Sequence, residues 1–232
     1  MTESTFYGSG FPYRRARELP GTLIVLEGSD GVGRSTQIAL LREWLEAEGM
    51  AVSDTGLRRS SLTQAGLDAA KQGHTLSRTT MSLFYAADFA DRLENQILPA
   101  LNAGFTVLSD RYFFSIIARD VVRGADPDWA RRIYGFALKP DIVFYLKADV
   151  QTLVARMVQG HGFDYWESGM DIRCADNLYD SFIVYQSRLI EQFDQLAEEF
   201  GFMTIDATLP ASTVFSELRD RIRETLSIQR AV

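Results

Sequence analysis

The chain contains 232 residues, of which 46% are hydrophobic, and it carries a formal net charge of -7. This composition is typical of a folded globular protein and argues against a disordered chain. The acidic balance lacks the electrostatic footprint of a protein that binds long nucleic acid. No apolar run approaches the ~20 residues that span a bilayer. We therefore expect neither long nucleic acid nor a membrane as a partner.

The number of cysteines and the N-terminal sequence give an expectation for the cellular location of the protein. Cys174 is the only cysteine, which excludes an internal disulfide and a metal site built from several cysteines. The first residues lack the basic start and apolar stretch of a secretory signal. A cytoplasmic location is the expectation that fits both observations.

Residues 1–20 differ in composition from the rest. They hold four aromatic residues, two prolines and three closely spaced arginines. We predict an irregular N-terminal arm here, followed by one domain over residues 21–232. The aromatic side chains favour docking of part of this arm on the domain or on a partner subunit. A poorly ordered tail is the alternative.

Further along, apolar runs alternate with amphipathic helical patterns. The predicted strands cover residues 23–26, 105–108, 142–146 and 202–205, and a further strand is predicted to begin at residues 50–52. The predicted helices cover residues 35–48, 79–102, 176–200 and 211–228. Apolar strands separated by helices predict an α/β fold with a five-stranded parallel sheet and helices on both faces, a three-layer arrangement. Ligands of such sheets bind at the carboxyl ends of the strands.

A glycine-rich turn follows the first predicted strand, in the sequence LIVLEGSDGVGRST. Gly28, Gly33 and Ser35 have the spacing of the phosphate-binding loop, G-x-x-x-x-G-K-[ST]. Small residues let the turn wrap so that backbone N–H groups point at an anion, and the helix that follows adds its positive end. Arg34 stands where that pattern has lysine. Arginine keeps the charge, but its guanidinium is planar and forked.

The loop therefore predicts binding of a nucleoside triphosphate. The expected nucleotide-binding residues are Gly28, Gly31, Gly33, Arg34, Ser35 and Thr36. Arg34 is expected to reach the β- and γ-phosphates and to act in catalysis, and Ser35 to offer its hydroxyl to Mg²⁺.

Asp30 is an anion inside a loop that would face phosphates. It is either a turn residue bonded to its own backbone, or a group that handles a magnesium-bound water or orients an arginine. We favour the second interpretation and predict a catalytic and substrate-binding role.

A second cluster, Asp110-Arg111-Tyr112, ends the strand predicted at residues 105–108. An aspartate there can complete a magnesium shell with Ser35. Arg111 can hold a second phosphate in bidentate fashion. An ordinary ion pair at the strand end is the alternative.

These segments together resemble the thymidylate kinase family of P-loop nucleoside monophosphate kinases. The resemblance rests on LIVLEGSDGVGRSTQ, LFYAADFADRLENQILPAL, VLSDRYFFSIIA and KPDIVFYL, and covers residues 21 to 226. It implies ATP as phosphoryl donor, Mg²⁺ as cofactor, a nucleoside monophosphate as acceptor and a homodimer formed by helices. A lid is implied at about residues 160–173.

Carried over by position, the resemblance gives further site residues. It implies that Arg111 binds the acceptor phosphate and that Arg156 acts in catalysis. Phe84, Asp88 and Ser115 are implied near the acceptor.

Several positions depart from the family pattern. Its arginine after Ala-Ala-Asp is Phe89 here, and its tyrosine and glutamine after the serine segment are Arg119 and Asp120. Arg119 either replaces the missing arginine across space or is a surface charge. Arg58, with its neighbour Arg59, either meets the acceptor phosphate or forms a solvated basic pair.

The hypothesis from the sequence is ATP-dependent phosphorylation of dTMP. Another pyrimidine or modified deoxynucleotide is the alternative acceptor. A degenerate nucleotide-binding protein without efficient transfer, and a kinase of a non-nucleotide acceptor, are the rival functions.

Overall fold

The computed structural model describes residues 6–11, 19–73, 76–160 and 162–231, with backbone alone for residues 227–231. Tyr13, the arginines of the arm and His161 lie outside these ranges.

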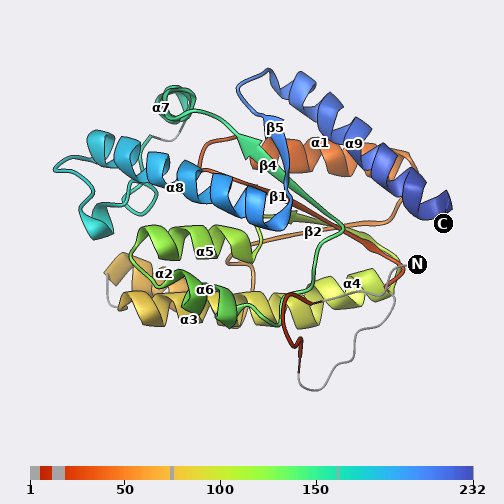
Figure 1. Cartoon of the computed structure of the whole chain (residues 1–232), viewed down its shortest axis with the longest axis horizontal. Helices are drawn as coiled ribbons and strands as arrows, with labels where there is room; N and C mark the ends of the chain where they lie inside the picture. The colour runs from red at the N-terminus through yellow and green to blue at the C-terminus, as the bar shows by residue number, and fades with distance from the viewer. Residues whose placement is uncertain (1–5, 12–18, 74–75, 161, 232) are drawn as a thin grey trace.

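One sheet of five parallel strands forms the centre of the molecule, in the order β2-β3-β1-β4-β5 (Figure 1). The strands are β1 (Thr22–Gly28), β2 (Val52–Gly56), β3 (Thr106–Asp110), β4 (Ile142–Lys147) and β5 (Met203–Asp206). The predicted fold class is confirmed. The second strand begins at Val52, within residues 50–52, where it was predicted to begin.

Helices cover both faces of this sheet. On one face pack α1 (Arg34–Ala47), α7 (Val150–Gln159) and α9 (Ala211–Ala231). On the other face pack α3 (Arg78–Arg92), α4 (Leu98–Asn102), α5 (Phe113–Val122) and α8 (Leu178–Phe200). Figure 1 shows α1 and α9 on one side of the strands and α5 and α8 on the other. No helix within the described ranges is long and apolar enough to cross a membrane.

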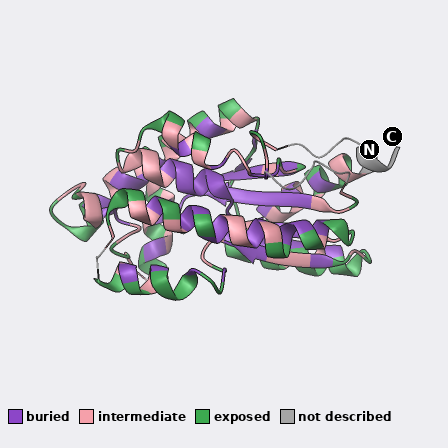
Figure 2. Cartoon of the chain, turned by 90° about the horizontal axis from the view of Figure 1, so that it is seen from below, coloured by how far each residue is buried: buried purple, intermediate pink, exposed green. Residues whose placement is uncertain are grey.

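Because both faces are covered, strand side chains are buried whichever way they point. Leu23 and Val25 enter the core beneath α5 and α8, whereas Ile24 and Leu26 enter the core beneath α1 and α9. All four are fully buried. Figure 2 shows the same continuous burial along the strands. This double burial explains why the first strand has no polar alternation.

The long helix predicted at residues 79–102 is interrupted. A π-helical turn, η1 (Leu93–Ile97), separates α3 from α4. Pro99 in α4 has no backbone N–H and cannot make the usual bond to the preceding turn, a common cause of such irregularity. Four further helices had no residue range predicted from the sequence. They are α2 (Gln64–Gly73), α5, α6 (Pro127–Ile133) and α7.

The described part of the N-terminal arm docks on its own domain. Phe6 forms an antiparallel bridge with Leu138, and the backbone N–H of Tyr7 donates to the carbonyl of Ala137 at 2.9 Å. The Tyr7 ring lies edge-on against Phe113. Phe11 is only 7% exposed. The aromatic residues of the arm therefore extend the core that supports α5.

This packing makes a test on Phe11 informative. We expect Phe11→Ala to lower the free energy of unfolding by ~3 kcal/mol, because it removes a buried ring packed on Phe136. Urea denaturation measures the change. Leu62→Ala is the control, since Leu62 is 76% exposed and its loss should change the stability by less than ~0.5 kcal/mol. Equal effects of the two variants would contradict docking of the arm.

Candidate active site

The strand register gathers the predicted loop and the Asp110 segment at one edge of the sheet. Gly56 of β2 and Leu26 of β1 both pair with Asp110 of β3. The turn that joins β1 to α1 leaves this edge. Gly31 and Gly33 have φ angles of 77° and 100°, a left-handed conformation that glycine adopts without strain. The turn therefore curls over the strand ends, as the phosphate-loop spacing predicts.

Arg34, the first residue of α1, folds back onto this turn. Its Nη1 donates to the carbonyl oxygens of Gly28 at 2.7 Å and Ser29 at 2.5 Å. Its Nε donates to Asp110 at 2.8 Å. The forked guanidinium thus makes three bonds at once, which a lysine ammonium could not reproduce in this geometry.

Ser35 and Asp110 lie in contact. The Ser35 hydroxyl donates to the second carboxylate oxygen of Asp110 at 2.9 Å. Burial raises the pKa of Asp110, but the charges of Arg34 and Arg111 and the bonds from Arg34 and Ser35 outweigh it, so the pKa lies below its usual value. A hydroxyl beside an ionised carboxylate fits Mg²⁺, which takes few protein ligands and completes its shell with phosphates and water. Thr36, the next residue, is exposed.

Arg111 connects the turn to α5. It is a non-glycine residue in the left-handed region, with φ of 73°, and its side chain is buried. The guanidinium donates to the Gly28 carbonyl at 3.1 Å and to the Ser115 hydroxyl at 2.9 Å, and it pairs with Asp30. Burial, reinforced by repulsion from Arg34, lowers the pKa of Arg111 to about 10.

Glu27, at the end of β1, fixes the start of α5. Its carboxyl oxygens accept bonds from the backbone N–H groups of Tyr112 at 2.7 Å and Ser115 at 3.2 Å, and from the Ser115 hydroxyl. The residue is fully buried, and burial raises its pKa. A carboxyl group at a helix N-terminus satisfies N–H groups that have no partner within the helix. Glu27 was not predicted, although a glutamate ending an apolar strand is a visible signal.

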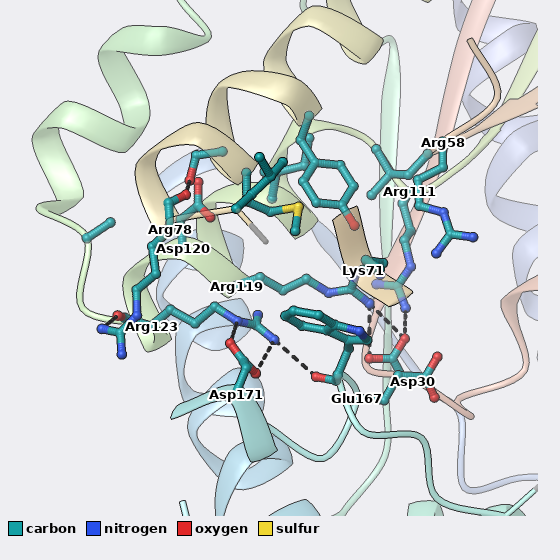
Figure 3. A pocket seen from close by; sticks show the side chains of 18 of the residues that line it. Asp30, Arg58, Lys71, Arg78, Arg111, Arg119, Asp120, Arg123, Glu167 and Asp171 are labelled. Carbon is teal, nitrogen blue, oxygen red and sulfur yellow. Dashed lines mark hydrogen bonds and ion pairs between the residues drawn. The ribbon is translucent and has the colours of Figure 1, made fainter. Parts of the chain in front are cut away.

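Asp30 is the centre of the ion pairs (Figure 3). Its carboxylate pairs with Arg111 and accepts from Arg119 at 2.9 and 3.1 Å, while Gln186 donates at 3.4 Å. Burial raises the pKa of Asp30, but the positive charges of Arg111, Arg119 and Arg34 lower it further, and the pKa lies below its usual value. The carboxylate therefore orients two arginines. Arg119 is not a surface charge.

A cavity of about 1400 Å³ opens beside these groups. One wall comes from α2 and α3, the opposite wall from α5, and the segment around Trp166 closes one side. Tyr85 lines this cavity, whereas the predicted Phe84 does not and lies against Gly66 of α2. Tyr85 was not among the predicted site residues.

The charges of the cavity wall are balanced. Its positive residues are Arg34, Arg58, Arg59, Lys71, Arg78, Arg111, Arg119 and Arg123. Its acidic residues are Asp30, Asp68, Asp110, Asp120, Asp126, Asp164, Glu167 and Asp171. Within the described part of the chain, only Lys71 and Arg78 of these cations have no carboxylate within 4 Å. The other six are held in place by ion pairs.

The predicted lid is docked on α5 and α8. Arg123 donates to the Trp166 carbonyl at 3.0 Å and pairs with Asp171 at 2.8 Å. Gln186 donates to the Glu167 carbonyl at 2.8 Å. Lys71 of α2 lies 5.7 Å from the centre of the Trp166 ring, across the cavity. These contacts hold the segment over the site.

Besides Phe84 and the fully buried Ser115, two more predicted residues do not line the cavity. Asp88 is fully buried and accepts bonds from the backbone of Arg58 and Ser60, so it shapes the loop after β2. Arg156 donates to the carbonyls of Val32 at 3.0 Å and Ala207 at 2.7 Å, behind the phosphate loop. In this structure, both side chains make hydrogen bonds to the backbone of the protein itself.

Arg58 and Arg59 both line the cavity, and each has a carboxylate partner. Arg58 pairs with Asp68 at 3.3 Å and Arg59 with Asp54 at 2.8 Å. Both side chains are nearly half exposed. They therefore do not form an unpaired, solvated basic pair, and their ion-pair partners lie outside the phosphate loop.

Comparison with known proteins adds the family. A family model described as thymidylate kinase matches residues 26–218. The chain belongs to the thymidylate kinase family. It is 39% identical over 206 residues to a probable thymidylate kinase 2 of Saccharolobus solfataricus, a match that covers 88% of this chain and 96% of that relative. It is 35% identical to a probable thymidylate kinase of Thermococcus kodakarensis, covering 84% and 94%, and 33% identical to a thymidylate kinase of Clavibacter michiganensis, covering 90% and 98%.

The structure explains one departure of this thymidylate kinase family member from the family's sequence pattern. Phe89, at the position of the expected arginine, is fully buried. Its ring packs edge-on against Tyr112 and lies beside Phe113 and Tyr134. A guanidinium at this position would enter an aromatic core.

The network around Asp30 predicts a pH-dependent stability. Asp30→Asn leaves two arginines without their carboxylate, and we expect it to lower the free energy of unfolding by ~3 kcal/mol near neutral pH. Because the folded pKa is depressed, this contribution is full above the unfolded pKa of about 3.9 and is lost as the pH falls below it.

Urea titrations of the wild type and the variant at pH 7 and pH 3 test this. The stability difference should shrink at pH 3. Asp220→Asn, which removes an exposed carboxylate, serves as the control and should have little effect at either pH. A difference that stays constant between the two pH values would contradict the role given to Asp30.

Proposed function

We propose that this chain transfers the γ-phosphoryl group of ATP to dTMP. The observation that carries the proposal is the position of Arg111. Its guanidinium joins the phosphate loop, through Gly28 and Asp30, to Ser115 in the first turn of α5, and Arg111 itself lines the cavity. A cation at that junction can contact an acceptor phosphate while the loop holds the donor. Family membership supports the same reaction, since the relatives named above are described as thymidylate kinases.

The proposed reaction needs positioning and charge neutralisation more than covalent chemistry. Backbone N–H groups of residues 28–36 would bind the triphosphate. Arg34 would neutralise charge at the β- and γ-phosphates, and Arg111 would hold the acceptor phosphate in line with the donor. The lid would exclude water, so that ATP is not hydrolysed.

Mg²⁺ is the proposed cofactor, with Ser35 and Asp110 as the residues that would hold it. The ion would neutralise phosphate charge in the transition state. The Ser35 hydroxyl and the ionised Asp110 carboxylate are already in contact, which supports this choice.

The remaining assignments are also proposals. The proposed substrates are small nucleotides, and long nucleic acid is not a proposed partner. The proposed location is the cytoplasm. A homodimer through helical faces is supported by the family and by Leu83 on α3, which is 50% exposed. Sedimentation velocity of the wild type and of Leu83→Asp would test that assembly.

A coupled assay of ADP release, run with dTMP, dUMP, dCMP, dAMP and dGMP, tests the function. We expect turnover with dTMP to exceed that with the other monophosphates. Absence of turnover with every acceptor would overturn the proposal and favour a degenerate nucleotide-binding protein.

Arg34 provides the sharper test of catalysis. We expect Arg34→Met to lower kcat by ~100-fold, because it removes a positioned cation from the transferring phosphates. We expect Arg34→Lys to lower kcat less than Arg34→Met does, because lysine keeps the positive charge. Its kcat should still fall, since one ammonium cannot make the three bonds of the guanidinium. Arg42→Met on the same helix is the control, because Arg42 is exposed and pairs with Glu46 outside the cavity. A large gain in Arg34→Lys would instead indicate a degraded site.

A further inference from the structure

The helices behind the lid hold the backbone carbonyl groups of three consecutive lid residues. Two of the donor side chains belong to α8 and are fully buried, and the third ends α5. The carbonyl oxygens and their donors are Trp166 with Arg123 at 3.0 Å, Glu167 with Gln186 at 2.8 Å, and Ser168 with Ser181 at 2.7 Å. A loop fastened at successive residues lacks the freedom of an ordinary surface loop.

Arg123 holds the lid at two points. Its guanidinium donates to the Trp166 carbonyl and also to both carboxylate oxygens of Asp171, at 2.8 and 3.1 Å (Figure 3). It donates to the Tyr185 hydroxyl as well, and its Cζ atom lies 4.9 Å from the centre of that ring. Arg78 of α3 donates to the backbone carbonyl of Arg123 at 2.8 Å. The arginine is therefore fixed at its backbone and at its charged end.

Between these two points the lid backbone lies directly on α8. Gly169 has a φ angle of 65°, and a Cβ atom there would lie 2.6 Å from the ring of Tyr185. Only glycine permits so close an approach in this conformation. The backbone N–H of Ser168 donates to the carbonyl of Asp164 at 2.9 Å. Residues 164–172, which we call the docked segment, are thus ordered by contacts from the chain itself.

We propose that Arg123 is a positioning residue for phosphoryl transfer, which acts through Trp166 and Asp171 by holding the docked segment over the cavity before substrates bind. This inference rests on the proposed function, because it takes the cavity as the acceptor site. Trp166, Glu167 and Asp171 of the segment all line that cavity.

A segment fixed in advance has two consequences for the reaction. A loop that closes only around its substrate loses conformational freedom at that step, which weakens binding. A segment that is already ordered loses little, so the acceptor should bind more tightly. The fixed segment also keeps water away from the transferring phosphoryl group. Arg123 therefore affects both the affinity for the acceptor and the balance between transfer and hydrolysis.

Hydrogen exchange of the full chain tests the docked segment without any substrate. We expect the backbone N–H groups of residues 164–172 to exchange slowly in the wild type. Arg123→Met should speed their exchange at least ~tenfold and leave the strands of the sheet unchanged, because the opening is local. Fast exchange in the wild type, or protection that arises only when dTMP is added, overturns the inference.

Arg131→Met is the matched control for the exchange experiment. Arg131 also donates to both oxygens of a carboxylate, that of Glu199 on α8, but it does not line the cavity. Its loss should leave exchange of the docked segment as in the wild type. Equal acceleration in the Arg123 and Arg131 variants overturns the inference.

Kinetics separate positioning from a general loss of structure. We expect Arg123→Met to raise the KM for dTMP ~tenfold while kcat falls much less, because the freed segment must be ordered at each binding event. The ratio of ATP hydrolysis to phosphoryl transfer should rise several-fold as water reaches the γ-phosphate. Arg123→Lys, which keeps the charge without the fork, should lie between the two proteins. A variant with lower kcat but unchanged KM and unchanged ratio overturns the inference.

Gly169→Ala frees the same segment by another route. The added methyl group would meet the Tyr185 ring, while no charge is removed and Gly169 itself does not line the cavity. We expect the same rise in KM and in the hydrolysis ratio, and a double variant with Arg123→Met should be little worse than either single one. Fast exchange with wild-type kinetics in Gly169→Ala overturns the inference. Absent turnover in a wild type whose segment exchanges slowly is different, since it faults the proposed function and supports the fixed segment.

Discussion

The double ion pair of Asp30 is the interaction on which the site depends. One buried carboxylate holds Arg111, from the end of β3, and Arg119, from the second turn of α5. A buried carboxylate is tolerated only when its charge is compensated, so the glycine-rich turn cannot shift without disturbing both arginines. Glu27 adds a second link, because it binds the first turn of α5 from the end of β1. The phosphate loop and the cavity wall are therefore built as one unit.

Charge balance explains how so many arginines share one cavity. Six of its eight cations have a carboxylate partner, so each guanidinium is oriented before any ligand arrives. Preorganised donors stabilise developing charge without paying for reorganisation at the moment of reaction. Lys71 and Arg78 differ, since neither has such a partner within the described ranges. Arg78 instead donates to the carbonyl of Arg123 at 2.8 Å, and Lys71 lies over the rings of Tyr85 and Trp166.

The aromatic core separates this chain from the pattern of its family. Phe89 occupies the position of an expected arginine and packs among Tyr112, Phe113 and Tyr134. The arm continues that cluster, with Phe11 against Phe136. A buried ring at this position fits such a cluster, because a guanidinium there would have to lose its hydration.

The sequence by itself determined the strands, the glycine-rich turn and the pair Ser35–Asp110, because apolar runs, glycine spacing and strand-end position are local signals. It also identified the family through several such segments together. Only the tertiary structure decided between Phe84 and Tyr85, placed Asp88 beneath a loop and turned Arg119 toward Asp30. These outcomes depend on which face of a helix meets the cavity and on charges from distant elements. Neighbouring residues on one helix differ by about 100° in direction, so position along the chain could not settle them.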